Sequence, residues 1–217
     1  MPVKKIVLIC SHQHSGSSAL YWCMCCNPRI QGVRVGYEHV YDHPLTFYAI
    51  ANGPHKHKTN AAIYMDELLF NHQLRTKSAY EICKFIYLVR PPTDVIPHLV
   101  TLTRHSPETV VRAYLFRLRR LCEMAKRTPG AVLLTFQELE SSKGIDTITD
   151  YLGLKQPIWY DPRVLDPVKV KVGQIPVDAR IMEMAEEGFE RYLYFLKSLD
   201  LRRPSSTILQ EPPVGSG

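Results

Sequence analysis

Small hydroxylated residues and a glycine follow an apolar segment close to the N-terminus. Residues 6–10 are Ile-Val-Leu-Ile-Cys, residues 15–18 are Ser-Gly-Ser-Ser, and an apolar stretch continues over 19–26. Where a buried strand turns into a helix through such a loop, backbone N–H groups and the positive end of the helix dipole point toward one place. Gly16 allows close approach of the backbone, and serine hydroxyls are further donors to phosphate oxygens. The pattern predicts a phosphate-binding loop, with a plain strand-to-helix loop capped by serine as an equal alternative.

A cationic residue, Arg90, ends the apolar segment 84–89. The carboxyl ends of parallel strands meet at one edge of a sheet, which is where α/β proteins bind their ligands. Arg90 is therefore expected beside residues 15–18, where its planar guanidinium offers paired donors to a phosphate. The alternative is a solvent-exposed arginine at a strand end.

The elements that must position these groups alternate along the chain. Short apolar segments predict strands over 4–10, 32–36, 84–89 and 131–136. Helices are predicted over 19–26, 45–51, 60–73, 106–127, 145–152 and 178–199. This order predicts a single α/β domain over 1–203, with a central parallel β-sheet flanked by helices on both faces. The tail over 204–217 is rich in Pro, Ser and Gly and is predicted to be disordered.

Length and composition fit a protein with its own core. The 217 residues are 45% hydrophobic and 22% charged, and no apolar run approaches the roughly 20 residues needed to cross a bilayer. No signal peptide is recognisable, so we expect a cytoplasmic protein without membrane contact. The six cysteines suggest free, buried thiols. No metal site is expected, because no second cysteine cluster lies at the spacing of a zinc site.

The formal net charge of +6 favours a polyanionic ligand. Charge alone does not choose among a nucleotide, a nucleic acid, an acidic glycan and a membrane surface. Aromatic residues do not alternate with basic ones along one surface, so no nucleic acid is expected. Most of Arg112, Arg117, Arg119 and Arg120 are predicted to form the solvated face of the helix over 106–127.

Five segments together resemble the sulfotransferases that use 3′-phosphoadenosine-5′-phosphosulfate (PAPS), most closely those of carbohydrate and bacterial type. Residues 14–20, HSGSSAL, resemble their 5′-phosphosulfate loop, and residues 87–95, YLVRPPTDV, resemble their 3′-phosphate motif. Three later segments resemble the family in the same order: VLLTFQEL over 132–139, YLGL over 151–154 and KVKVG over 169–173. The resemblance spans about residues 4–199 and implies the P-loop NTPase-like sulfotransferase fold.

The resemblance implies a binding site for PAPS and its product, adenosine 3′,5′-bisphosphate. Ser15, Gly16, Ser17 and Ser18 would hold the 5′-phosphosulfate. The 3′-phosphate would lie near Arg90, His98, Lys171 and Gly173, and His14 would lie against the bridging oxygen. The chain departs from the family in having His14 for a lysine or arginine, Pro91 for an acidic residue and His98 for a serine. The charge of His14 would depend on pH near neutrality.

Sulfuryl transfer also requires a general base for the proton of the acceptor. In related enzymes the base is a Glu or His shortly after the first helix and the second strand, which places it within residues 36–43 here. Glu38 is the first candidate, and His39 and His43 are the alternatives. Surface positions for all three are an equal alternative. The acceptor would be a small molecule or a carbohydrate.

Two other functions fit the same residues. The departures from the family pattern are consistent with a catalytically altered relative that binds a nucleotide or another polyanion. A small-molecule kinase is the other alternative. No lysine follows Gly16 as in a Walker A loop, and no second acidic strand end is available for Mg²⁺, so the kinase is disfavoured.

Overall fold

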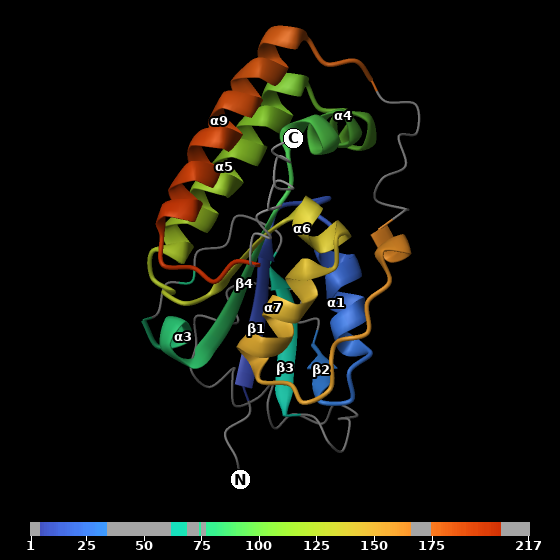
Figure 1. Ribbon diagram of the computed structural model, residues 1–217. Coiled ribbons are helices and arrows are strands. Elements are labelled where there is room, and N and C mark those ends of the chain that lie inside the picture. Colours follow the sequence, from blue (N-terminus) through green and yellow to red (C-terminus); the bar gives the residue numbers. More distant parts are fainter. Residues whose placement is uncertain (1–4, 34–61, 69–73, 75–76, 166–174, 205–217) are drawn as a thin grey trace, which may run out of the picture.

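The computed structural model describes residues 5–33, 62–68, 74, 77–165 and 175–204. Within them the strands form one parallel sheet in the order β2-β3-β1-β4-β5 (Figure 1). The strands are β1 (Lys5–Ser11), β2 (Ile30–Gly32), β3 (Ile63–Leu68), β4 (Cys83–Val89) and β5 (Val132–Thr135). In this order β1 lies between β3 and β4, so it has a hydrogen-bonded strand on each side.

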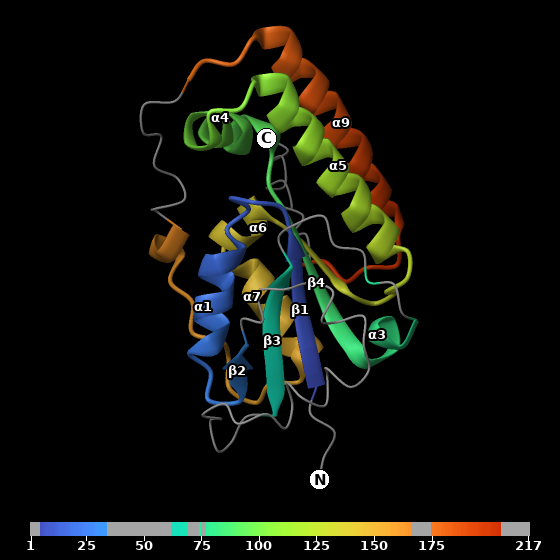
Figure 2. The ribbon, with the colours of Figure 1, turned by 180° about the vertical axis from the view of Figure 1, so that it is seen from behind.

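Helices cover both faces of the sheet (Figures 1 and 2). The described helices are α1 (Ser17–Cys25), α3 (Lys77–Ile82), α4 (Pro92–Thr103), α5 (Pro107–Ala125), α6 (Phe136–Glu140), α7 (Lys143–Leu152), α9 (Ala179–Ser198) and a 3-10 helix over Pro162–Leu165. Helices α1 and α7 lie on one face, and α5 and α9 lie side by side on the other. This is the predicted α/β architecture with a parallel sheet.

Alternate residues of β1 enter two different cores, which explains why the whole strand is apolar. Ile6 and Leu8 pack with α4, α5 and α9, whereas Val7 and Ile9 pack with α1 and α7. A strand that is buried on both faces needs apolar residues at every position rather than at every second one.

Most of the predicted elements are confirmed, with ends shifted by a few residues. The predicted strands over 4–10, 84–89 and 131–136 correspond to β1, β4 and β5. The predicted helix over 106–127 is α5, and the hydroxyl of Ser106 accepts the Thr109 N–H at its start. The predictions over 145–152 and 178–199 correspond to α7 and α9.

The middle of the chain differs from the prediction. A helix was expected over 60–73, but Ile63–Leu68 is the strand β3, which pairs with β1 on one side and β2 on the other. Local sequence does not contain these pairings, and tertiary contacts decide the conformation of a short segment. The strand β2, Ile30–Gly32, shares only Gly32 with the strand predicted over 32–36, and residues 34–36 lie outside the described residues. The predicted helix over 45–51 and the tail over 205–217 lie outside the described residues.

Two further expectations concern the state of the cysteines and the presence of a membrane-spanning helix. None of the six cysteines, all of which are described, forms a disulfide, and Cys10, Cys23, Cys83 and Cys122 are buried. No helix in the described part of the chain has the length and apolar character required to cross a membrane.

Candidate functional site

The loop between β1 and α1 has an unusual backbone. His14 and Gly16 both adopt left-handed conformations, with φ of 57° and 91°. This conformation is natural for glycine and uncommon for other residues. Helix α1 starts directly after Gly16, which has no side chain to cap it, so the first N–H groups of the helix face the loop. The loop therefore has the backbone geometry of an anion site at a helix N-terminus.

The serine hydroxyls of the loop have different surroundings. Ser15 and Ser17 are buried, and the Ser15 hydroxyl has no hydrogen-bond partner among the residues that the structure describes. A buried polar group without a partner costs free energy, and a phosphate oxygen would supply the missing partner. Ser18 instead donates to the carboxylate of Glu67, with oxygens at 3.1 and 3.5 Å. The unpaired Ser15 hydroxyl is an observation independent of the helix end, and it fits a bound anion.

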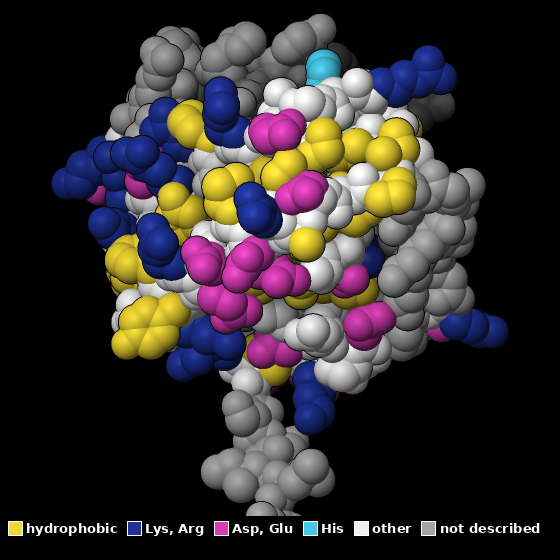
Figure 3. Space-filling view, turned by 90° about the horizontal axis from the view of Figure 1, so that it is seen from above, with side chains coloured by type: hydrophobic (Ala, Val, Ile, Leu, Met, Phe, Trp, Pro, Cys, Tyr) yellow, Lys and Arg dark blue, Asp and Glu magenta, His cyan; other side chains and the backbone are white. Residues whose placement is uncertain are grey.

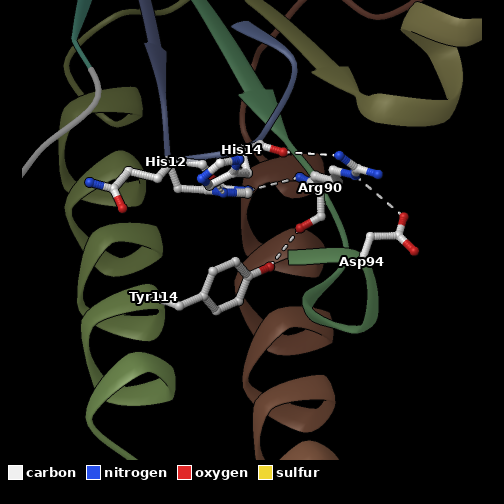
Figure 4. A network of polar contacts seen from close by, with 6 residues as sticks. His12, His14, Arg90, Asp94 and Tyr114 are labelled. Atoms are coloured by element: carbon white, nitrogen blue, oxygen red, sulfur yellow. Dashed lines mark hydrogen bonds and ion pairs between the residues drawn. The ribbon is translucent and has the colours of Figure 1, made fainter. Parts of the chain in front are cut away.

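Arg90 lies at the same edge of the sheet as this loop, as the order of elements predicted (Figure 4). Its side chain is buried, and its Nη1 donates to the carbonyl of His14 at 3.1 Å. Its Nε is 3.4 Å from the carboxylate of Asp94, and its guanidinium stacks over the ring of Phe136 at 3.9 Å. Arg90 thus brings a fixed positive charge to the loop and also holds the backbone of His14 in place.

His12, which the sequence analysis did not select, fixes the backbone of Arg90 (Figure 4). The Arg90 N–H donates to His12 Nε2 at 3.0 Å, so Nε2 is unprotonated and Nδ1 carries the proton toward the carbonyl of Gln13 at 2.9 Å. Burial lowers the pKa of His12 to about 4, which keeps the imidazole neutral. Tyr114 of α5 donates to the Arg90 carbonyl at 2.7 Å. The only available sequence signal for His12 is its position directly after β1.

His14 and His98 meet through their rings, whose centres are 4.4 Å apart. Burial is the main cause that lowers the pKa of His14, and the charges of His98 and Arg90 lower it further. Without an anion His14 is therefore mostly neutral at neutral pH. The structure brings His14, residues 15–18, Arg90 and His98 together, and their roles toward a ligand remain predictions.

Glu67 is a carboxylate at this edge that the sequence analysis missed. It lies near the end of β3, opposite Ile9 of β1, and accepts the hydrogen bond from Ser18. The incorrect helix prediction over 60–73 placed no strand end here, so Glu67 was not considered for the site.

Arg117 is the exception to the expectation that most of the arginines on α5 are solvated. Its side chain is buried and donates to the carbonyls of Ser11 and Leu68, at the ends of β1 and β3. Burial lowers the pKa of Arg117 to about 10, so it stays charged at pH 7. Arg117 shares the buried face of α5 with Tyr114 and Leu118, which explains why it points inward. A second buried cation therefore lies close to the loop.

The other predicted residues are not tested by the structure. Glu38, His39, His43, Lys171 and Gly173 lie outside the described residues.

Comparisons with known proteins bear on the fold. No family model and no curated protein sequence matches this chain. A solved structure of mouse sulfotransferase SULT7A1 complexed with PAP is similar with a TM-score of 0.56 and 14% identity, over 92% of this chain and 90% of that chain. A structure of the PezAT toxin–antitoxin system of Streptococcus pneumoniae aligns over 89% of this chain with 10% identity, but its TM-score of 0.33 is too low to support an argument. The chain therefore has a sulfotransferase-like fold.

Proposed function

We propose that this protein is a sulfotransferase that moves the sulfuryl group of PAPS to a hydroxyl or amine acceptor. The observation that carries the proposal is the shared position of two groups that suit phosphates. One is the loop before α1 with the unpaired hydroxyl of Ser15, and the other is Arg90 at the end of the neighbouring β4. Both suit a ligand with phosphate groups at two places, as in PAPS. The likeness to a sulfotransferase complexed with PAP supports the same proposal.

Each part of the site has a proposed role toward PAPS. Residues 15–18 would bind the 5′-phosphosulfate through backbone N–H groups and hydroxyls. Arg90 would bind the 3′-phosphate together with His98, which stands where the family has a serine. His14 would lie against the oxygen that joins phosphorus and sulfur.

The chemistry would be an in-line displacement at sulfur, with PAPS as the donor. The acceptor oxygen forms a bond to sulfur, the bond from sulfur to the bridging oxygen breaks, and adenosine 3′,5′-bisphosphate leaves. Negative charge grows on the bridging oxygen, so donors fixed in advance around it lower the barrier. The N–H groups at the start of α1 would be such donors.

A general base must receive the proton of the acceptor, and Glu67 is a candidate that stands on observed geometry. Its carboxylate already accepts a hydrogen bond from Ser18 of the loop. A carboxylate beside an anion site is unfavourable for binding alone and suits proton transfer. Glu38, His39 and His43 remain the other candidates.

A second function, nucleotide binding without transfer, is favoured by one observation. His14 is mostly neutral at the position where the family has a permanent cation, because burial, His98 and Arg90 lower its pKa. Weaker stabilisation of the leaving group would slow transfer while leaving the phosphate-binding loop intact.

Calorimetric titration with adenosine 3′,5′-bisphosphate, beside ATP and AMP and without magnesium, tests the nucleotide site. We expect micromolar binding that is selective for the bisphosphate. The Arg90→Ala variant should weaken it at least tenfold, as expected from loss of a charged hydrogen bond of about 1.5–3 kcal/mol. Arg104→Ala, an exposed arginine at the end of α4, is the matched control. A preference for ATP, or equal affinity in Arg90→Ala, would contradict the proposal.

A transfer assay with PAPS separates the two proposed functions. Glu67→Gln should bind the bisphosphate at least as tightly as the wild type, because a negative charge beside the anion site is removed, and should reduce turnover by about 100-fold or more, the usual contribution of a general base. Glu38→Gln serves as the comparison. If only Glu38→Gln loses turnover, the base is Glu38. If the wild type binds the bisphosphate but transfers to no acceptor in a broad screen, the binding function is the correct one.

A further inference from the structure

A pocket of about 270 Å³ lies beside the candidate site, between the loop after β1 and the helices α4 and α5. His12 and Gln13 line it from the loop, Leu99 lines it from α4, and Val110 and Tyr114 line it from α5. We infer that this pocket binds the acceptor, and that the acceptor is a compact molecule with a hydroxyl group on an apolar body. The inference rests on the proposed sulfotransferase function and adds the substrate class to it.

The side chains of the pocket are ordered by depth. Leu99, Val110 and Tyr114 are buried, whereas Thr103, His105 and Thr109 are exposed. Apolar walls below a polar rim suit a ligand whose body is apolar. The volume of about 270 Å³ is just below the range of small-molecule sites, about 300–1,000 Å³, and so suits only a compact ligand. A long glycan chain would need an extended groove, and a pocket of about 270 Å³ is too small to enclose one.

Two residues that line the pocket are chain neighbours of site residues. Gln13 precedes His14 in the chain, and Leu99 follows His98. Since the rings of His14 and His98 are in contact, the pocket lies next to that pair. A ligand held here would have one end near the loop proposed to bind the phosphosulfate. The inference requires that a hydroxyl at that end reach the sulfur held by the loop.

The charges around the pocket select a hydroxyl over an amine. Arg117 lines the pocket and is a buried cation. His12 is neutral, and both of its ring nitrogens are engaged with the backbone of Arg90 and Gln13. An ammonium group entering the pocket would lose its hydration and meet a like charge, whereas a neutral alcohol would not.

Equilibrium binding of two matched probes tests the inference with the full chain saturated with adenosine 3′,5′-bisphosphate. Naphthalen-2-ylmethanol and naphthalen-2-ylmethylamine share one apolar body and differ in hydroxyl against ammonium, and N-acetylglucosamine represents a sugar. We expect the alcohol to bind at least tenfold more tightly than the amine or the sugar, as the like charge and the apolar walls require. With PAPS, mass spectrometry should detect the sulfated alcohol.

Ala113→Leu is the informative variant, because Ala113 is an exposed residue of α5 that lines the pocket. The larger side chain should fill the space and weaken binding of the alcohol by about tenfold or more. Arg112→Leu, which adds the same side chain one residue earlier and outside the pocket lining, should have no effect. Both variants should bind the bisphosphate as the wild type does.

The possible failures are distinguishable. If the bisphosphate binds but the alcohol does not, or if Ala113→Leu binds the alcohol normally, the pocket assignment is overturned while the nucleotide site stands. Tighter binding of the amine or the sugar overturns the substrate class. If the bisphosphate itself does not bind, the proposed function fails and the acceptor role of the pocket fails with it, even where the alcohol binds.

Discussion

At the scale of single residues, the charge of His14 depends on what lies against it. Its ring contacts His98, and its carbonyl accepts from the guanidinium of Arg90. Burial, then His98 and then Arg90, lower its pKa below the ordinary value of 6.5. A bound phosphate would oppose all three effects, because a negative charge favours the protonated imidazole. Protonation of His14 is therefore expected to be linked to ligand binding.

We expect the affinity for adenosine 3′,5′-bisphosphate to increase as the pH is lowered from about 7.5 to about 6. If the pKa of His14 is higher in the complex than in the free protein, the complex holds more protons in this range. Binding then strengthens as the pH falls toward the lowered pKa of the free protein, by about tenfold per pH unit at most for one proton. Calorimetric dissociation constants across this range measure the slope.

His14→Gln is the matched control for this slope. The phosphates of the ligand also gain protons in this range, since their second pKa is about 6, and this acts equally on both proteins. The difference between the two slopes therefore measures the proton uptake on binding that depends on His14. Parallel slopes would show that His14 does not take up a proton on binding.

Some site residues could be predicted from sequence because their type and their place at a strand end are both local features. Residues 15–18 follow β1 and Arg90 follows β4, and the structure brings them together. Glu67 could not be predicted, because it reaches the site only through the pairing of β3 with β1. His12 could not be predicted as a support, because its partner is the backbone of Arg90, 78 residues further along the chain.

At the scale of elements, α5 joins the ends of two strands through one side chain. Arg117 donates to the carbonyls of Ser11 and Leu68, the last residues of β1 and β3. Both strands end at the edge of the sheet where the candidate site lies, so Arg117 holds the backbone beneath the site in place. The helix itself was predictable from the capping residue Ser106 and the apolar period of its buried face. Arg117 points inward because of its position on the buried face of α5. Its residue type alone predicts an exposed side chain.

Arg117→Met should lower the free energy of unfolding by about 3 kcal/mol. The substitution keeps most of the length of the side chain but removes its hydrogen bonds to two buried carbonyls, and a charged hydrogen bond contributes about 1.5–3 kcal/mol. Urea denaturation measures the change, and Arg112→Met on the exposed face of α5 should alter stability by no more than about 0.5 kcal/mol. Equal stability of the two variants would mean that the strand ends do not depend on Arg117.

At the scale of the molecule, the sheet order places the candidate site in the middle of the fold. After β1 the chain builds β2 and β3 on one side, and then β4 and β5 on the other. The carboxyl ends of β1 and β4 thus form a switch point of the kind where α/β proteins bind ligands. The alternation of apolar strands and helices made this architecture predictable. The strand β3 was not predictable, because its pairing depends on residues distant in sequence.

The net charge of +6 is less informative at this scale than the site itself. Seen from above, basic, acidic and apolar side chains are mixed on the described surface (Figure 3). Two cations, Arg90 and Arg117, are instead buried close to the loop. An anion that binds there interacts with groups from β4 and α5 as well as from the loop before α1, so binding should stabilise the fold as a whole.

Scanning calorimetry with and without adenosine 3′,5′-bisphosphate tests this coupling. The two cores share one sheet, so we expect a single transition in which the calorimetric and van't Hoff enthalpies agree. Ligand at about 100 times its dissociation constant should add about 2.7 kcal/mol and raise the midpoint of that transition by roughly 5–10 °C. AMP, which lacks the 3′-phosphate, should raise it less. Two transitions, of which the ligand moves only one, would instead mean that the faces of the sheet unfold separately and that the ligand stabilises only part of the fold.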